Sequence, residues 1–555
     1  MSQKDQYLYL QIHPKDNVLV ALQDLKSGSL IKHTNNSFTL LDDVKAKHKF
    51  SLTELNTGDQ IIMYGVLVGK ANQPIRKGAL LTTSNISHAT NDFKLGERKL
   101  DWETPNISEW KQKQFNGFHR ADGSVGTANY WLVISLVFCE NRNMDILKQT
   151  LVDKLGYGIV SDYQNKFQIL IDQFNSGKNI DEILNIDLDK FTSVEKQKSK
   201  IFPQVDGVKF LTHELGCGGT RNDARNLCGL LAGYITNPNV AGATVLSLGC
   251  QNAQVSLLQE ELLKRDSNFS KPLFVFEQQM EGTEEALMNN ALKQTFCGLI
   301  EANKLKREPA PLSKLCVGLE CGGSDGFSGI SANPAIGYTS DIISALGGSV
   351  ILAEFPELCG VEQELADRCV DDNNASRFIQ LMKSYNEKAE ALGSGFYANP
   401  SPGNIKDGLI TDAIKSAGAA KKGGTSPVTE VLDYPEKAQK SGLILLCTPG
   451  SDVESTTAVV GAGANIVLFT TGLGTPTGNP VAPVIKLSTN TKLYHKMPDI
   501  IDINCGSIIE GIETIKEAGE RILEYVIKVA SGEEIPKSVK LCQDDFIPWK
   551  RDISL

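Results

Sequence analysis

The sequence predicts an α/β protein in which a small N-terminal β-domain precedes two domains built on mainly parallel, Rossmann-like sheets. Short apolar or β-branched runs separated by turn residues fill roughly the first 90 residues. From residue 115 onward, buried-strand patterns alternate with helical patterns in units of ~30 residues, which is typical of parallel sheets with crossover helices. Such sheets place their functional loops at the carboxyl ends of the strands.

The N-terminal domain is expected to span residues 1–91. Its predicted strands are Tyr7–Ile12, Val18–Leu22, Phe38–Leu41, Ile61–Val68 and Ala79–Thr83. Turn signals such as Thr57-Gly58-Asp59 separate them. Residues 92–114 are strongly polar, with Pro105 in the middle, and predict a linker or a strap over the surface.

The middle domain is expected over 115–310 and the C-terminal domain over 311–555. The middle domain has predicted strands at Tyr130–Phe138, Val208–Thr212 and Val240–Leu248, helical spacing over Ile146–Leu155 and Arg225–Ile235, and a polar helical insertion near 160–205. The C-terminal domain has predicted strands at Leu315–Leu319, Ser349–Glu354, Leu443–Cys447 and Val467–Thr471, and a predicted helix at Pro334–Leu346. Ser451 and Glu454 have capping-box spacing, which predicts the start of another helix.

Composition excludes several classes of function. The chain has 555 residues, with 56 basic and 66 acidic side chains and a formal charge of −10. This balance disfavours a nucleic-acid partner or binding to an anionic membrane surface. No apolar stretch is long enough to span a bilayer, and no signal-peptide pattern opens the chain. Twelve cysteines without a CxxC pair indicate reduced thiols, so we expect a cytoplasmic location.

Four glycine-containing loops with reactive or polar side chains come directly after predicted strands. They are His213–Gly219, Glu320–Gly326, Thr470–Pro476 and Asp502–Gly506. Glycine lets a backbone approach a ligand closely, and Cys, His and Asp are suitable metal ligands. A Gly-Gly pair after a strand is more often a tight turn, but several such loops at the same end of predicted strands favour a site.

Two nucleotide-binding motifs are excluded. Gly461-Ala462-Gly463 has half of a dinucleotide fingerprint, but it follows a helix and precedes a strand, the reverse of the required order. The chain contains no phosphate-binding loop of the Walker A type.

Motifs over nearly the whole chain make it resemble the altronate/galactarate dehydratase family. In the second and third domains they are FHRADGSVGTANY (118–130), HELGCGG (213–219), NPNVAGATVLSLGCQNAQ (237–254), GLECGGSDGFSGISANPAIG (318–337), NPSPGN (399–404), KSAG (415–418), KKGGTSP (421–427) and FTTGLGTPTG (469–478). In the N-terminal domain HKFSLTEL (48–55), GDQIIMYGVLVGKA (58–71) and GALLTTSN (78–85) resemble the family's SAF (β-clip) domain.

The resemblance implies a sugar-acid dehydratase that converts D-altronate to 2-dehydro-3-deoxy-D-gluconate and water. It implies Fe(II), with Mn(II) as a substitute, and a homodimer. A divalent cation can stabilise the enediolate-like species formed when the proton α to a carboxylate is removed, and a general acid must protonate the departing 3-hydroxyl.

Residues carried over from the matching motifs give the expected site. We expect catalytic roles for His213, Cys217, Asp325 and Lys415, with Lys415 a base if burial lowers its pKa. We expect substrate contacts from Glu320, Cys321, Ser324, Asn404, Gly472 and Gly474, and metal ligation by His48, His213 and Cys217.

The chain also departs from the family pattern. Thr82 and Ser84 replace a usual histidine pair, Ala128 and Leu473 replace arginines, Asn237 replaces a histidine and Gln251 a glutamate. An arginine binds a carboxylate through a bidentate fork, which neither Ala128 nor Leu473 can supply. Three alternatives therefore stay open: a lyase acting on galactarate or sulfolactate, an iron–sulfur enzyme with Cys217, Cys321 and Cys505 as ligands, and a non-catalytic sugar-acid-binding paralogue.

Overall fold

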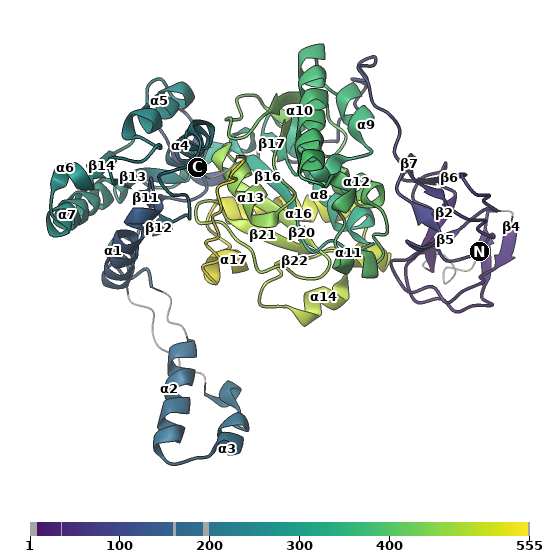
Figure 1. The fold of residues 1–555 in the computed structure, drawn as a ribbon, viewed down its shortest axis with the longest axis horizontal. Helices are drawn as coiled ribbons and strands as arrows, with labels where there is room; N and C mark the ends of the chain where they lie inside the picture. Colours follow the sequence, from purple (N-terminus) through teal and green to yellow (C-terminus); the bar gives the residue numbers. More distant parts are fainter. Residues whose placement is uncertain (1–7, 35, 159–161, 192–198, 553–555) are drawn as a thin grey trace.

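The protein consists of three domains arranged in a row, with the C-terminal domain in the centre (Figure 1). The structure, a computed structural model, describes residues 8–34, 36–158, 162–191 and 199–552. The purple N-terminal β-domain lies at one side of the C-terminal domain and the middle domain at the opposite side (Figure 1). The mixed α/β architecture predicted from the sequence is confirmed.

The N-terminal domain is made of short antiparallel strands in three small sheets. Its strands are β1 (Tyr9–Leu10), β2 (Val18–Ala21), β3 (Leu30–His33), β4 (Asn36–Thr39), β5 (Lys49–Ser51), β6 (Gln60–Met63), β7 (Val66–Ala71) and β8 (Ile86–Ser87).

The predicted strand Ile61–Val68 is wrong, because the chain reverses at Tyr64-Gly65 and forms the β6–β7 hairpin. Both turn residues have positive φ (58° and 79°), as a tight hairpin turn requires. The predicted strand Ala79–Thr83 is also wrong. In this stretch Leu80 forms only an isolated bridge to Phe50, and the strand lies at β8 instead.

The middle domain is built around the parallel sheet β12-β11-β13-β14. Its central strand β11 is buried along its whole length, as its continuous apolar sequence predicts. The elements are β9 (Gln114–His119), β10 (Val125–Gly126), β11 (Tyr130–Ser135), η2 (Phe138–Glu140), α1 (Asn141–Lys154), α2 (Asp162–Asn175), α3 (Ile180–Leu184), β12 (Gly207–Leu211), α4 (Arg221–Thr236), β13 (Val240–Ser247), α5 (Val255–Arg265), β14 (Leu273–Glu277), α6 (Gln278–Glu281), α7 (Glu284–Ala302) and β15 (Glu308–Pro311).

Helices α2 and α3 form an arm that extends away from the rest of the molecule (Figure 1). This arm lies within the insertion that the sequence placed near 160–205, of which 160–161 and 192–198 are outside the described residues. Its helices carry exposed apolar side chains, among them Phe167, Phe174, Ile180 and Leu184.

The C-terminal domain contains a seven-stranded parallel sheet in the order β18-β19-β17-β16-β20-β21-β22. Its elements are β16 (Cys316–Cys321), η5 (Ser328–Ile330), α8 (Ala332–Ala345), β17 (Ser349–Leu352), η6 (Phe355–Leu358), α9 (Glu362–Asp367), α10 (Asp372–Ala391), α11 (Pro402–Lys406), α12 (Asp412–Ala419), η8 (Ala420–Gly423), β18 (Val428–Leu432), β19 (Gly442–Leu446), α13 (Asp452–Gly461), β20 (Ile466–Thr471), β21 (Val484–Ser488), α14 (Thr491–Lys496), β22 (Ile503–Asn504), α15 (Gly506–Ile509), α16 (Ile515–Ala530) and α17 (Lys537–Lys540). The helix predicted at Ser451 is confirmed, but the Ser451 side chain forms no cap hydrogen bond.

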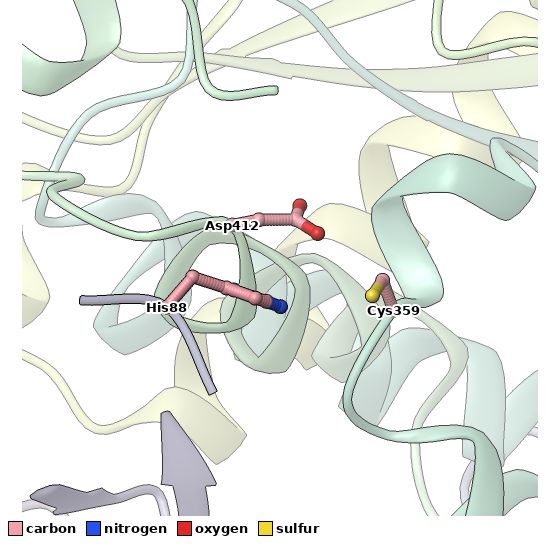
Figure 2. Close-up of side chains that lie close together, drawn as sticks. All are labelled: His88, Cys359 and Asp412. Carbon is pink, nitrogen blue, oxygen red and sulfur yellow. The ribbon is translucent and has the colours of Figure 1, made fainter. Parts of the chain in front are cut away.

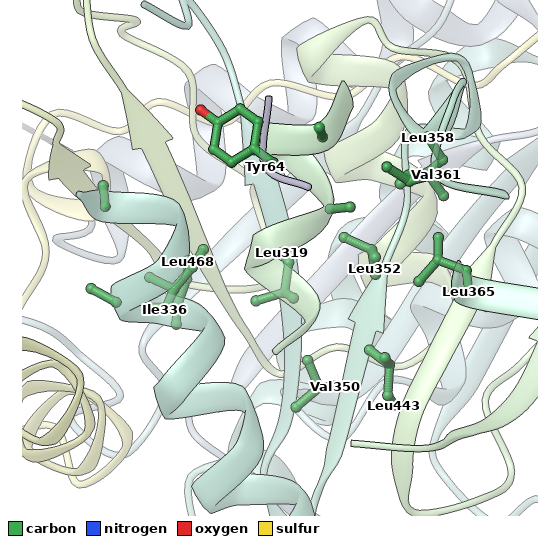
Figure 3. Packing of buried hydrophobic residues seen from close by; sticks show 14 of the residues in the cluster. Tyr64, Leu319, Ile336, Val350, Leu352, Leu358, Val361, Leu365, Leu443 and Leu468 are labelled. Atoms are coloured by element: carbon green, nitrogen blue, oxygen red, sulfur yellow. The ribbon is translucent and has the colours of Figure 1, made fainter. Parts of the chain in front are cut away.

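Apolar cores join the domains to one another. Helix α13 packs against both β16 and α4, so the two parallel sheets share one core. On the other side, the core of the C-terminal domain includes Tyr64 from the β6–β7 turn (Figure 3). The Tyr64 hydroxyl lies over Gly329 and Gly418, where an added Cβ would come within 2.3 Å and 3.4 Å of it. The β-clip is therefore docked on the C-terminal domain and is not merely tethered to it.

The polar segment after the β-clip runs along α9 as a strap. The Lys94 amide donates to Gln363 and the Lys99 ammonium forms an ion pair with Asp367 at 2.7 Å. The Arg98 guanidinium donates to the Ala366 carbonyl at 2.6 Å.

Candidate active site

The loops after β16 and β20 meet at the carboxyl edge of the seven-stranded sheet. The chain runs from β16 to β17 on one side and returns to β20 on the other, so the strand order reverses at this point. The Gly472 and Leu473 amides both donate to the Gly323 carbonyl, each at 3.0 Å. In open α/β sheets such a reversal point is where ligands bind.

A buried cluster of charged side chains lies beside this point. Cys321 ends β16, Glu354 and Glu357 follow β17, Lys415 lies on α12 and Lys422 on η8. Glu354, Glu357 and Lys422 are at most 1 % exposed. The sequence had suggested Cys321 and Lys415, but not the other three.

Hydrogen bonds connect all five members of this cluster. The Lys422 ammonium donates to Cys321 Sγ at 2.9 Å and forms an ion pair with Glu354. The Cys321 thiol donates to Glu357 at 3.2 Å, and Glu357 pairs with the Lys415 ammonium. A neighbour, Asn399, accepts from Lys415 at 2.9 Å.

The charges of the cluster balance inside the protein. Burial, with the neighbouring Glu354, raises the pKa of Glu320 well above its ordinary range. Burial alone would also raise the pKa of Glu357, but the Lys415 and Lys422 ammonium groups outweigh it and lower that pKa. Glu354 and Glu357 each face an ammonium group, and burial raises the pKa of Glu354 above its ordinary value.

Lys415 is held as a cation. Burial favours the neutral amine, but attraction to Glu357 and Cys321 is stronger and raises the pKa of Lys415 above its ordinary value. The condition under which the sequence made Lys415 a base, a lowered pKa, is therefore not met in this geometry. The arrangement suits a group that holds and orients an anionic or hydroxyl-bearing ligand.

Asp452, the first residue of α13, lies at the outer side of the cluster. Burial, together with the charges of Glu354 and Glu357, raises the pKa of Asp452 to about 7. The absence of a side chain at Gly322 leaves room for the Asp452 carboxylate, since a Cβ at residue 322 would come within 2.0 Å of one of its oxygens. A carboxyl group with a pKa near neutrality can both give and take a proton.

Glu354 has a strained backbone, with φ 63° and ψ 57°. Its amide donates to the Thr448 hydroxyl at 2.8 Å, and that hydroxyl donates to Ser455, which in turn donates to Glu320 at 2.7 Å. This chain of hydrogen bonds connects the Glu354 backbone to the Glu320 carboxyl group and fixes the position of both.

Asp325 connects the β-clip to the sheet edge. Its carboxylate is fully buried, forms an ion pair with Lys47 at 2.9 Å and accepts from Thr489 and Asn490 at 3.0 and 3.2 Å. The neighbouring Lys49 ammonium donates to the Gly408 carbonyl. Asp325 therefore joins the β-clip to the loop after β16 through partners that a local pattern cannot show, and its catalytic role stays a prediction.

Three profiles of one family cover the described domains. The altronate/galactarate dehydratase SAF domain matches residues 7–89, the second domain of D-galactarate dehydratase/altronate hydrolase matches 117–303, and the C-terminal domain of D-galactarate/altronate dehydratase matches 312–554. The chain belongs to the D-galactarate/altronate dehydratase family.

Full-length relatives agree with this assignment. An altronate dehydratase of Bacillus subtilis (strain 168) is 34 % identical over 527 residues, 95 % of each chain. An altronate dehydratase of Escherichia coli (strain K12) is 33 % identical over 95 % of this chain and 96 % of its own. A galactarate dehydratase (L-threo-forming) of the same organism is 30 % identical over 95 % and 93 %. The chain is thus a hydro-lyase, a sugar-acid dehydratase of this family, and the resemblance and the SAF domain predicted from the sequence are confirmed.

Within this dehydratase, the predicted substrate residues Ser324, Asn404, Gly472 and Gly474 shape the sheet edge. The Asn404 amide donates to the Ser324 carbonyl at 2.7 Å, which holds the loop after β16. A Cβ on Gly472 would come within 2.2 Å of the Asp325 carboxyl carbon, and Gly474 has φ 97°.

The dehydratase does not bring His48, His213 and Cys217 together. His48 lies in the β-clip against the Lys406 carbonyl, at the opposite side of the molecule from β12 (Figure 1). Both His213 ring nitrogens are used by backbone groups, Ser135 O at 2.9 Å and Leu215 N at 3.1 Å, and burial lowers the pKa of His213 to about 4. This geometry makes His213 a structural residue of the middle domain.

The cysteines Cys217, Cys321 and Cys505 are also apart. Cys321 and Cys505 are both buried. Cys321 ends β16 and Cys505 follows β22, and these strands are three strand spacings, or about 14 Å, from each other. Cys217 instead shares the carboxyl edge of the middle sheet with two more exposed cysteines, Cys139 and Cys250, which follow β11 and β13. Hydrogen bonds join the three loops, from Phe138 N to Leu215 O at 3.0 Å and from Asn252 to Gly219 O at 2.8 Å.

The positions where the chain departs from its family have local partners. Thr82 and Ser84 share a hydrogen bond at 2.7 Å, and Gln251 is buried and donates to Ser247. Asn237 donates to the Val460 and Ala464 carbonyls, each at 3.0 Å, and so ties the middle domain to α13. These residues are satisfied structural elements in this dehydratase.

Two groups of three side chains among the described residues could hold a metal ion. In the first, Cys321, Glu354 and Glu357, the two lysine ammonium groups already neutralise the carboxylates. In the second, His88, Cys359 and Asp412, no ammonium group forms an ion pair within the described part of the chain (Figure 2). This second set fits Fe(II) better, because imidazole, thiolate and carboxylate are all ligands of this metal.

Proposed function

We propose that the protein dehydrates D-altronate to 2-dehydro-3-deoxy-D-gluconate. The observation that carries the proposal is the buried cluster of Cys321, Glu354, Glu357, Lys415 and Lys422 at the reversal point of the sheet, with Asp452 at its outer side. The two altronate dehydratases that match 95 % of the chain support this substrate over others.

In this proposal Lys415 orients the substrate through its ammonium group and Asp452 moves the proton. Removal of the proton on C2 and protonation of the departing 3-hydroxyl need a group that changes its charge near neutral pH. Asp452 meets that requirement, while Glu354, Glu357 and Lys422 hold the charge balance around it. Fe(II), or Mn(II) in its place, would supply Lewis-acid stabilisation of the negative charge on the substrate carboxylate, held by His88, Cys359 and Asp412.

The test is a turnover assay on protein purified without oxygen and supplied with Fe(II) or Mn(II). D-altronate, D-galactarate and sulfolactate are offered separately, and formation of a 2-keto-3-deoxy acid or of sulfite is followed. We expect turnover with altronate. Exclusive turnover of galactarate or release of sulfite would refute the substrate, and binding without turnover of any acid would indicate a non-catalytic paralogue.

Replacing Asp452 with asparagine should lower the rate about 100-fold or more, because a positioned acid–base group contributes that much. It should also remove the limb of the pH–rate profile near pH 7.

Stability provides a second readout of the Asp452 pKa. The raised pKa means that the folded state holds the Asp452 proton more tightly than the unfolded state. The contribution of Asp452 to the free energy of unfolding therefore declines as pH rises from about 4 to about 7. The melting temperature of the wild type should therefore fall relative to D452N between pH 4.5 and pH 7.5. An unchanged pH–rate profile in D452N would exclude Asp452 as the proton carrier.

An iron–sulfur hydro-lyase is the second candidate, favoured by the three exposed cysteines at one edge of the middle sheet. Three thiolates leave one iron of a cluster open for a hydroxyl group. Protein purified without oxygen would then be brown, and the visible absorbance would be lost in C139S, C217S and C250S alike. A colourless protein that is active with added Fe(II) rules this candidate out.

We further propose a homodimer located in the cytoplasm. All twelve cysteines are free thiols, which fits a reducing compartment, and no helix among the described residues is long and apolar enough to cross a membrane. The exposed apolar residues of the α2–α3 arm fit an interface with a second copy, since an arm that projects from the molecule has little core of its own.

Charged substitutions on this arm should dissociate the dimer. F167D combined with F174D should shift the mass measured by light scattering from two chains to one, with little change in melting temperature, because both side chains are more than 60 % exposed. The matched control is L392D, at a still more exposed apolar residue directly after α10. A dimer that persists in F167D/F174D would place the interface elsewhere.

A further inference from the structure

Three potential metal ligands meet where the β-clip touches the C-terminal domain. His88 follows β8, Cys359 follows η6, and Asp412 opens α12. Their ligand atoms all lie within 4.8 Å of one another. The His88 ring, the Cys359 sulfur and the Asp412 carboxylate are directed into the same space (Figure 2).

Two of these atoms are buried without a hydrogen bond. Asp412 is 2 % exposed, and its Oδ2 has no hydrogen-bond partner among the described residues; the same holds for His88 Nδ1. The other Asp412 oxygen accepts from Ser416 at 3.3 Å. Leaving a buried carboxylate oxygen and a buried ring nitrogen unpaired costs free energy that a ligand between them would recover.

The surrounding backbone fixes the relative position of the three ligands. The Thr411 hydroxyl caps α12 and donates to the Val68 carbonyl of β7 at 2.9 Å. Strand β7 pairs with β8, which leads into His88. Gly69 permits this contact, since a Cβ there would come within 2.7 Å of the Ser87 carbonyl oxygen. The two domains therefore present their ligands without rearrangement.

The chemistry of the three side chains selects the ligand. Imidazole, thiolate and carboxylate together carry two negative charges, which a divalent ion neutralises within a buried space. The nitrogen and sulfur donors disfavour Mg²⁺ and Ca²⁺, which take oxygen ligands, and favour Fe²⁺, Co²⁺ or Zn²⁺. Three protein ligands would leave a coordination position for a small ligand.

We propose that His88, Cys359 and Asp412 form a transition-metal site shared between the β-clip and the C-terminal domain. Its metal binding is independent of the proposed function, and only its use in catalysis rests on that function. The site is joined to the charged cluster by two short connections. Cys359 is two residues from Glu357, and Asp412 is three residues from Lys415 on α12, so a bound ion would share its support with the Glu357–Lys415 pair.

Anaerobic titration with Co²⁺ tests the proposal without requiring activity. Full-length protein stripped with a chelator is titrated, and the sulfur-to-cobalt charge-transfer band, the bound metal per chain and the melting temperature are measured. We expect one strongly bound ion per chain, a charge-transfer band, and an increase in melting temperature.

Single substitutions then assign the ligands. C359S should remove the charge-transfer band, and H88Q and D412N should each weaken Co²⁺ binding at least 10-fold. The matched controls are C217S and C297S, two exposed cysteines outside the site, which should keep the band. The metal-free D412N should fold as the wild type does, because asparagine keeps the size of the side chain and Asp412 forms no ion pair among the described residues.

Each outcome bears on a different claim. Absence of a charge-transfer band in the wild type, or a band that survives C359S, would overturn the metal site; loss of the band in C217S would place the metal on the middle domain instead. Normal Co²⁺ binding in a protein that dehydrates no sugar acid would refute the proposed function and leave the metal site standing.

Discussion

Replacing Lys415 with methionine should abolish dehydration and lower the free energy of unfolding by about 3 kcal/mol. A second replacement in the same chain, Glu357 with glutamine, should restore stability without restoring activity. Removing one partner of a buried ion pair leaves the other charge uncompensated, which typically costs about 3–5 kcal/mol. Lys415 is 9 % exposed and Glu357 1 %, so solvent cannot compensate for the loss.

The double variant separates folding from chemistry. In K415M/E357Q no unpaired charge remains at this pair, so its unfolding in denaturant should approach that of the wild type. Dehydration should stay at least 1000-fold reduced, since the ammonium group that orients the substrate is absent (about 4 kcal/mol of transition-state stabilisation). K421M, a half-buried lysine without an ion pair among the described contacts, is the matched control. A double variant that regains activity would make Lys415 a purely structural cation.

Replacing Asp325 with asparagine should lower stability by about 3 kcal/mol and release the β-clip from the C-terminal domain. Asparagine keeps the size of the side chain, but it cannot form the ion pair with Lys47. Its NH2 group must also face a donor, either the Lys47 ammonium or the Phe327 amide, which donates to the Asp325 carboxylate at 3.1 Å. We expect at least a 100-fold loss of dehydration and faster proteolytic cleavage within the strap 92–114.

The variant K47M distinguishes two roles for Asp325. If Asp325 acts by docking the β-clip, K47M should show the same protease sensitivity and a comparable loss of activity, and K47M/D325N should be no worse than either single variant. If Asp325 contacts the substrate, D325N should lose far more activity than K47M at equal protease sensitivity. Lys26, an exposed partner of Asp43 in the same domain, provides the control K26M.

Sequence patterns predicted the parts of the site that lie within single loops. Cys321, Ser324 and Asp325 stand in one glycine-rich segment after a strand, and the structure places that segment at the reversal point of the sheet. The sequence also ended a strand at Glu354, but no local pattern brings Glu354 next to Lys422, which is 68 residues away. The pairing depends on the order of strands in the sheet and on η8, which follows α12.

Other features of the structure could not be predicted from a local sequence pattern, each for a different reason. The apolar run from Ile61 to Val68 has no asparagine-glycine turn signal, so the reversal at Tyr64-Gly65 could not be predicted from it and is shown only by the pairing of β6 with β7. His213 has the residue type of a metal ligand, but the backbone around Ser135 uses both of its nitrogens. The ligands of the proposed metal site come from three separate segments, and none of them stands in a motif.

The docking of the β-clip has a consequence for how the enzyme could be assembled. Tyr64, Lys47, Lys49 and Thr411 hold the two domains through side-chain and backbone contacts, while the strap merely limits how far they can separate. In such a case the covalent connection acts by effective concentration, which for a short linker is on the order of millimolar. A β-clip supplied as a separate polypeptide should therefore bind at the same position on the C-terminal domain when both polypeptides are abundant. A gene split within 92–114 would then encode a two-subunit enzyme.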